Sequence, residues 1–115
     1  MRNEEHQLQV TIVKYLRYNK YIVFSIPNHG VRSTRMGAYY KEEGLMAGVA
    51  DLFIMKGNST YNGIFLELKS KQGRMNDAQK EFQRHCILLD YEYWLIKDLE
   101  TLIEKLNRYE KRINL

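Results

Sequence analysis

Two carboxylates and a lysine are best placed to do chemistry, because they interrupt apolar stretches of the sequence. Asp51 lies in ADLFIM, Glu67 lies in GIFLEL, and Lys69 follows directly after GIFLEL. Side chains of a β-strand alternate between its two faces, so Glu67 and Lys69 share a face, about 7 Å apart along the strand. If the two stretches pair as a hairpin, Asp51 can lie near Glu67 on that same face.

This combination of side chains is suited to the hydrolysis of phosphodiester bonds. Clustered carboxylates repel one another unless a cation lies between them. A hard ion such as Mg²⁺ binds through one or two carboxylates, polarises a phosphoryl oxygen and lowers the pKa of a bound water. The lysine can orient or deprotonate the attacking water, or neutralise charge that develops on the phosphate. The three residues therefore predict a metal-dependent nuclease site.

A simpler explanation is a hairpin with one solvated face. Asp51 would then end a strand, and Glu67 and Lys69 would point into water. The apolar runs around both carboxylates argue against it, because they are typical of buried strands. Charged side chains are rarely buried there unless they are paired or bind a metal.

Two further polar residues are candidates for the same site. Glu5 precedes Leu8 and Ile12 by three and seven residues, so it lies on the apolar stripe of the first helix. It can reach the site as a metal ligand, directly or through water, or it can simply complement the helix dipole. Gln79 follows Asn76 by three residues, which a capping box would explain. The functional alternative is a contact between Gln79 and the catalytic water, the lysine or the phosphate.

The hydrophobic periodicity predicts an α/β fold with the element order α-β-α-β-β-α-β-α. This order implies a four-stranded mixed sheet flanked by helices. Asn3, Asn76 and Asp98 are the expected N-caps of three of the helices. The expected helices cover 3–19, 34–43, 77–89 and the residues after Asp98, and the expected strands cover 20–26, 50–56, 62–70 and 91–97.

Length and composition favour a single globular domain over residues 1–115. The 18 Lys and Arg against 14 Asp and Glu give a formal charge of +4, a mild excess that suits a polyanionic partner. The sequence contains no apolar run long enough for a membrane span and no signal-peptide core, so a cytoplasmic protein is expected. The single cysteine, Cys86, excludes an intrachain disulfide and is expected to be a buried thiol.

The motifs together resemble the PD-(D/E)XK nuclease superfamily, and more closely its VRR-NUC family, including stand-alone phage and bacterial members. Nearly the whole chain takes part in this resemblance. Ala50 stands where many members have proline. The matching stretches are EEHQLQ, IPNHGVRS, KEEGLMAGVADLF and FLELKSKQGRMNDAQKEF.

The resemblance implies a restriction-endonuclease-like core, Mg²⁺ or Mn²⁺ as cofactor, and activity on DNA. It implies a homodimer that resolves Holliday junctions. From the sequence, either the apolar last helix or the first helix can make the dimer interface, and the pattern does not decide between them. The alternatives are a flap or nicking nuclease in replication or repair, a catalytically silent module that binds branched DNA, and a structural protein. The implied catalytic residues are Asp51, Glu67, Lys69 and Gln79, and the implied metal ligands are Asp51, Glu67, the carbonyl of Leu68, and Glu5.

Recognition of DNA is expected to depend on its shape and its phosphates, because the chain contains no sequence-reading motif. Polar and basic residues around the motifs are the candidates to line the DNA. They are Asn28, His29, Arg32, Arg35, Lys41, Lys71 and Arg74.

Overall fold

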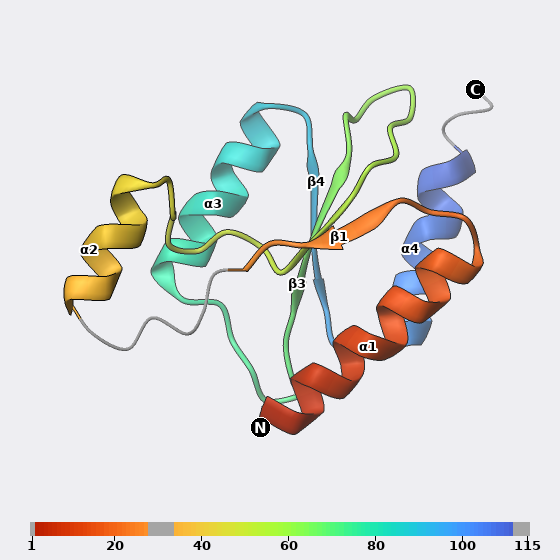
Figure 1. Cartoon of the computed structure of the whole chain (residues 1–115). Coiled ribbons are helices and arrows are strands. Elements are labelled where there is room, and N and C mark those ends of the chain that lie inside the picture. The colour runs from red at the N-terminus through yellow and green to blue at the C-terminus, as the bar shows by residue number, and fades with distance from the viewer. Residues whose placement is uncertain (1, 28–33, 112–115) are drawn as a thin grey trace.

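The computed structural model describes residues 2–27 and 34–111, which form four helices and one sheet (Figure 1). The element order is the one expected from the sequence. The helices are α1 (Arg2–Tyr18), α2 (Thr34–Glu42), α3 (Asp77–Leu88) and α4 (Leu99–Lys111), and the strands are β1 (Val23–Ser25), β2 (Leu52–Ile54), β3 (Ile64–Leu68) and β4 (Glu92–Ile96).

The sheet is mixed, and its strands are ordered β1-β2-β3-β4. β1 and β2 are antiparallel, β2 and β3 are antiparallel, and β3 and β4 are parallel. The parallel pair requires a crossover, which α3 supplies. The prediction of a four-stranded mixed sheet flanked by helices is therefore confirmed.

The two faces of the sheet are covered by different helices. α1 and α4 lie on one face and α3 lies on the other (Figure 1). The larger core joins Ile12 of α1 and Leu102 of α4 to Leu66 of β3. A smaller core beneath α3 contains Cys86, whose thiol is buried as expected and whose pKa burial raises to about 11.

The apolar stripes of α1 and α4 are buried in this core. Ile12, Leu16 and Leu102 are fully buried, and Leu106 is 3% exposed. Neither stripe is therefore available to a second copy of the chain. That the first or last helix supplies a dimer interface stays a prediction, and such an interface would have to use other faces of these helices.

α4 is also fastened to the connection between β2 and β3. The Tyr109 hydroxyl donates to the Lys56 carbonyl at 2.6 Å, and the Asn58 amide donates to the Tyr109 carbonyl at 3.1 Å. The Asn58 side chain also accepts from the backbone N–H groups of Thr60 and Tyr61, as in an Asx-turn. These bonds fix the turn that sets the register of the two strands.

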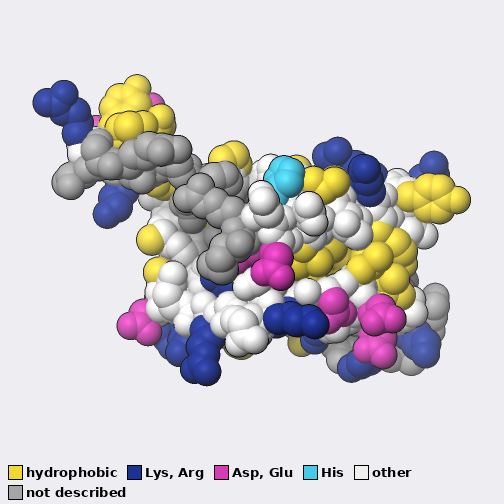
Figure 2. All heavy atoms as spheres, turned by 90° about the horizontal axis from the view of Figure 1, so that it is seen from below, with side chains coloured by type: hydrophobic (Ala, Val, Ile, Leu, Met, Phe, Trp, Pro, Cys, Tyr) yellow, Lys and Arg dark blue, Asp and Glu magenta, His cyan; other side chains and the backbone are white. Residues whose placement is uncertain are grey.

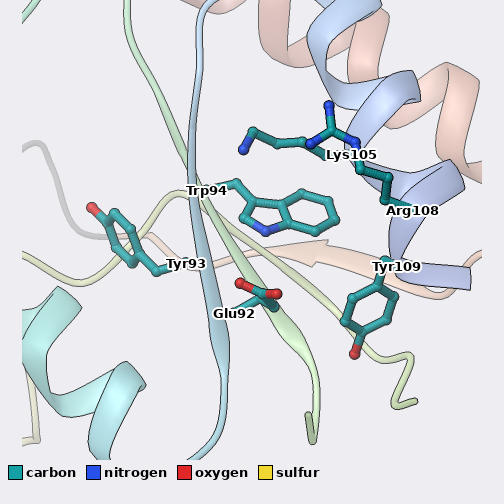
Figure 3. Close-up of a pocket in the computed structure, with 6 residues that line it drawn as sticks. All are labelled: Glu92, Tyr93, Trp94, Lys105, Arg108 and Tyr109. Atoms are coloured by element: carbon teal, nitrogen blue, oxygen red, sulfur yellow. The ribbon is translucent and has the colours of Figure 1, made fainter. Parts of the chain in front are cut away.

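The outer edge of β4 faces α4 across a shallow pocket of about 220 Å³ (Figure 3). Trp94 forms its wall, and the Lys105 ammonium lies 5.9 Å from the centroid of the indole. Arg108 and Tyr109 complete the α4 side. Figure 3 shows Tyr93 on the opposite side of β4 from Trp94, as strand alternation requires.

α2 is set apart from the rest of the molecule. Of the described helices and strands, none packs against it. Within residues 2–27 and 34–111, no helix has the length and apolar character that crossing a membrane requires.

Candidate active site

The register of β2 and β3 brings Asp51 beside Glu67. Leu52 pairs with Leu66, and the N–H of Asp51 donates to the Leu66 carbonyl at 2.9 Å. The side chain of Asp51 makes a further hydrogen bond, in which its carboxylate accepts from the backbone N–H of Leu68 at 2.8 Å. The hairpin register on which the sequence argument depended is therefore the observed one.

Glu67 is the buried centre of the group, with 3% of its surface exposed. The Gln79 side-chain amide donates to its Oε2 at 2.9 Å, and the Lys69 ammonium lies 3.6 Å from the same oxygen. Its other oxygen, Oε1, is buried and has no hydrogen-bond partner among the described residues. One side of the carboxylate is thus fixed by polar contacts and the other is left unsatisfied.

The electrostatics of Glu67 reflect this position. The pKa of Glu67 is raised to about 7, mainly by burial and then by the charges of Asp51 and Glu5, while Lys69 acts in the opposite direction. Desolvation and like charge both disfavour the ionised form. A cation between the carboxylates would reverse this balance.

Gln79 forms the capping box that the sequence allowed, and its side chain also enters the site, although the contact is to Glu67, whereas the lysine, the catalytic water or the phosphate was expected. Its side-chain oxygen accepts from the Asn76 N–H at 2.9 Å, and its own N–H donates to Asn76 Oδ1 at 2.8 Å, which completes a capping box. Its side-chain NH₂ group is then directed to Glu67. The cap therefore aims the amide, and the start of α3 becomes part of the site.

Gly48 holds the start of α3 against the segment that carries Asp51, just before β2. Its φ is +88°, and a Cβ at this position would lie 2.3 Å from the Ala78 carbonyl oxygen. Only glycine allows this close approach. The sequence argument gave Gly48 no role, although its place in the GVADLF stretch was a signal that could have identified it.

Glu5 lies on the side of α1 that faces the site. Its side chain is half-buried, and its charge contributes to the raised pKa of Glu67. Its role as a metal ligand stays a prediction, as does that of the Leu68 carbonyl.

The donor set suits a hard divalent ion. No group of three or more His, Cys, Asp or Glu side chains placed to hold a metal occurs within residues 2–27 and 34–111. Mg²⁺ does not need such a group, because it binds proteins through one or two carboxylates and keeps several waters. Asp51 and Glu67 meet this requirement, and Glu67 Oε1 is a buried oxygen that lacks a protein partner. The residues therefore fit Mg²⁺ or Mn²⁺ better than Zn²⁺.

The candidate DNA-binding residues fall into three groups. Asn28, His29 and Arg32 lie outside the described residues. Arg35 and Lys41 are exposed on α2, apart from the carboxylates. The third group consists of Lys71 and Arg74. Both are exposed and lie between β3 and α3, on the segment that joins Lys69 to Gln79.

Lys69 also borders a groove of about 360 Å³, which runs between the start of α1 and the residues that follow β3 and β4. Lys71 and Lys97 border it, and the Lys97 ammonium donates to the Lys71 carbonyl at 3.0 Å. Figure 2, seen from below, shows Lys and Arg side chains distributed around this face, with acidic side chains among them. The basic residues near the site thus form a local group and not a continuous stripe.

Comparison with solved structures finds a protein described as "VRR_NUC domain protein". The TM-score is 0.79 at 21% sequence identity, over 95% of this chain and 89% of the other. This chain has the VRR-NUC domain fold. None of the protein-family models matches the sequence, and none of the curated proteins does. The VRR-NUC architecture that the motifs predicted is therefore confirmed at the level of the fold.

Proposed function

We propose that the chain is a metal-dependent nuclease that hydrolyses phosphodiester bonds in branched DNA, with four-way junctions as the preferred substrate. The observation that carries this proposal is the buried Glu67 carboxylate, set beside Asp51, Lys69 and Gln79 with one oxygen unsatisfied. The VRR-NUC fold supports it, because members of that family are nucleases.

Each residue has a part in the proposed reaction. Asp51, Glu67 and the Leu68 carbonyl would hold Mg²⁺ or Mn²⁺, with Glu5 reaching the ion directly or through water. The ion supplies a polarised phosphoryl oxygen and a bound water of lowered pKa. Lys69, held 3.6 Å from Glu67 Oε2, neutralises charge on the phosphate or orients the attacking water.

Cleavage of synthetic DNA tests this function directly. Junction, flap, nicked and linear duplexes of matched sequence are incubated with the protein and Mg²⁺ or Mn²⁺, and initial rates are compared. We expect the junction to be cut fastest. We expect each of Asp51→Asn, Glu67→Gln and Lys69→Ala to lower the rate by roughly 10²-fold or more.

Two matched variants control for the loss of a carboxylate or a lysine elsewhere. Glu104→Gln and Lys111→Ala alter exposed residues of α4 and should cut at the wild-type rate. Cutting by Asp51→Asn at the wild-type rate would contradict the proposed metal-dependent mechanism. Junction binding without cutting in any metal would favour a catalytically silent module, and faster cutting of flaps would favour the flap nuclease.

A homodimer is part of the same proposal. A four-way junction has two-fold character and needs two symmetric cuts, which a C₂ dimer provides with its two active sites. Analytical ultracentrifugation should give the mass of two chains for the protein alone. With a junction it should give the mass of two chains plus one junction. A single chain per junction would contradict this part of the proposal.

A further inference from the structure

The side chain of Tyr93 faces the same side of the sheet as the proposed site. Tyr93 of β4 pairs with Phe65 of β3, and strand alternation puts Phe65 and Glu67 on one face. Figure 3 shows the tyrosine ring projecting from β4 on the side away from Trp94. Tyr93 and Glu67 therefore lie on neighbouring strands, two residues apart in register, beneath the same helix.

The ring is packed tightly and its hydroxyl is unsatisfied. Tyr93 is 9% exposed, clusters with Ala50 and Cys86, and meets Phe82 of α3 at a ring-centroid distance of 6.2 Å. In the described part of the chain its hydroxyl finds no hydrogen-bond partner. Buried tyrosine hydroxyls usually have a partner, because an unmade bond leaves the cost of desolvation uncompensated.

Charge links this hydroxyl to the site. Burial raises the pKa of Tyr93 well above its ordinary value, and the neighbouring charges of Glu67, Cys86 and Asp51 raise it further. The hydroxyl therefore keeps its proton and remains a donor. Glu67 Oε1, the other buried side-chain atom without a partner among the described residues, is an acceptor.

We propose that Tyr93 is a positioning residue, whose hydroxyl donates through one buried water molecule to Glu67 Oε1. A bridging water needs two or more polar partners, and these two groups supply a donor and an acceptor on one face. Gln79 would then orient Oε2 and Tyr93 would orient Oε1. A carboxylate oxygen has two lone pairs, so Oε1 can accept this bond and still bind a cation. The effect on metal binding rests on the proposed function, whereas the water bridge does not.

The test compares Tyr93→Phe with Tyr109→Phe, which removes a buried hydroxyl from the opposite face. Mg²⁺ affinity is measured by calorimetry and stability by the midpoint of thermal unfolding. We expect Tyr93→Phe to weaken Mg²⁺ binding about tenfold, as loss of an outer hydrogen bond to a metal ligand typically does. Its unfolding midpoint should change less than that of Tyr109→Phe, because Glu67 Oε1 can keep the bridging water. Tyr109→Phe should keep the Mg²⁺ affinity and unfold at a lower temperature, because the Lys56 carbonyl loses its donor.

A Tyr93→Phe affinity within twofold of wild type would overturn the positioning role. A wild type that binds no divalent ion would count against the proposed function, and the bridge is then decided by a high-resolution crystal structure without metal. A water within hydrogen-bond distance of both Tyr93 Oη and Glu67 Oε1 supports the inference. The absence of any atom between them overturns it.

Discussion

Glu67 is buried as deeply as a core leucine, yet it is a carboxylate next to another carboxylate. Its two oxygens differ, since Oε2 receives the Gln79 amide and the Lys69 ammonium, whereas Oε1 has no partner in the described part of the chain. The ionised form of Glu67 is therefore electrostatically strained when no metal ion lies beside it. That strain is what a bound cation would relieve.

The raised pKa of Glu67 predicts a pH dependence of stability. The group binds its proton more tightly folded, with a pKa of about 7, than unfolded, with the ordinary value of 4.5. Its contribution to stability is thus complete below pH 4.5 and is lost as the pH rises to about 7. Urea unfolding of the metal-free wild type and Glu67→Gln measures this. We expect the wild type to lose stability relative to the variant across that window, and parallel curves would contradict the assignment.

What could be predicted at this scale is uneven, for physical reasons. Alternation placed Glu67 and Lys69 on one face, and the hairpin register placed Asp51 beside them. The sequence left Gln79 with two alternatives, because an amide can accept at a cap and donate to a carboxylate at once. A role for Tyr93 could not be predicted from its position in the sequence. Its strand, β4, lies beside β3 only because α3 connects the two strands in parallel.

At the scale of elements, the site depends on how the start of α3 meets the segment before β2. Gly48 is in direct contact with the backbone of Ala78. Gln79 is the next residue, so any displacement there moves the amide that holds Glu67. The docking of one helical turn is thereby coupled to the chemistry.

Two described glycines, Gly44 and Gly48, have a positive φ, and substituting each in turn separates the effect of backbone strain from the effect of helix docking. Gly48→Ala should lose roughly 1–3 kcal/mol of stability and should also cut DNA more slowly, because α3 must shift. Gly44→Ala adds a Cβ at a φ of +111° with no atom within 4 Å. It should lose stability through backbone strain alone. Chemical unfolding and cleavage rates per folded molecule measure the two effects, and equal rates for both variants would refute the coupling.

The strands are shorter than their apolar patterns indicated. The first was expected over 20–26 but is β1 (Val23–Ser25). The chain is still turning after the end of α1 at Tyr18, because Lys20 is left-handed and the Tyr21 N–H donates to the Leu16 carbonyl. The others lose one to two residues at their ends where turns begin. Periodicity predicted which elements exist and in what order, whereas their ends depend on backbone bonds that hydrophobicity does not encode.

At the scale of the whole molecule, the formal charge of +4 is distributed over several groups. Lys69, Lys71 and Lys97 line one groove together with Glu4 and Asp98, and Arg74 lies on the segment that follows Lys71. Arg35 and Lys41 lie on the separate α2. Net charge alone would attract DNA anywhere, so only local contacts can align it with the carboxylates.

Salt dependence distinguishes local contact from net charge. We expect Lys71→Ala with Arg74→Ala, in an Asp51→Asn background, to reduce the slope of log affinity against log salt by about 0.9 per lost phosphate contact. Lys14→Ala with Lys111→Ala removes the same charge from exposed positions on α1 and α4. This control should leave the slope unchanged. Fluorescence anisotropy with a labelled junction measures both, and equal slopes for the two pairs would show that the first pair does not touch DNA.

The outer edge of β4 has a consequence for solubility. A sheet with two open edges invites strand addition by other chains, the first step towards fibrous aggregates. β1 discourages this by being only three residues long. Along β4, Lys105, whose ammonium lies 5.9 Å from the Trp94 ring centroid, and Arg108 place two cations beside the edge strand. Positive charge beside an edge strand, as in the pocket of Figure 3, is one of the features that disfavour edge-to-edge pairing of sheets.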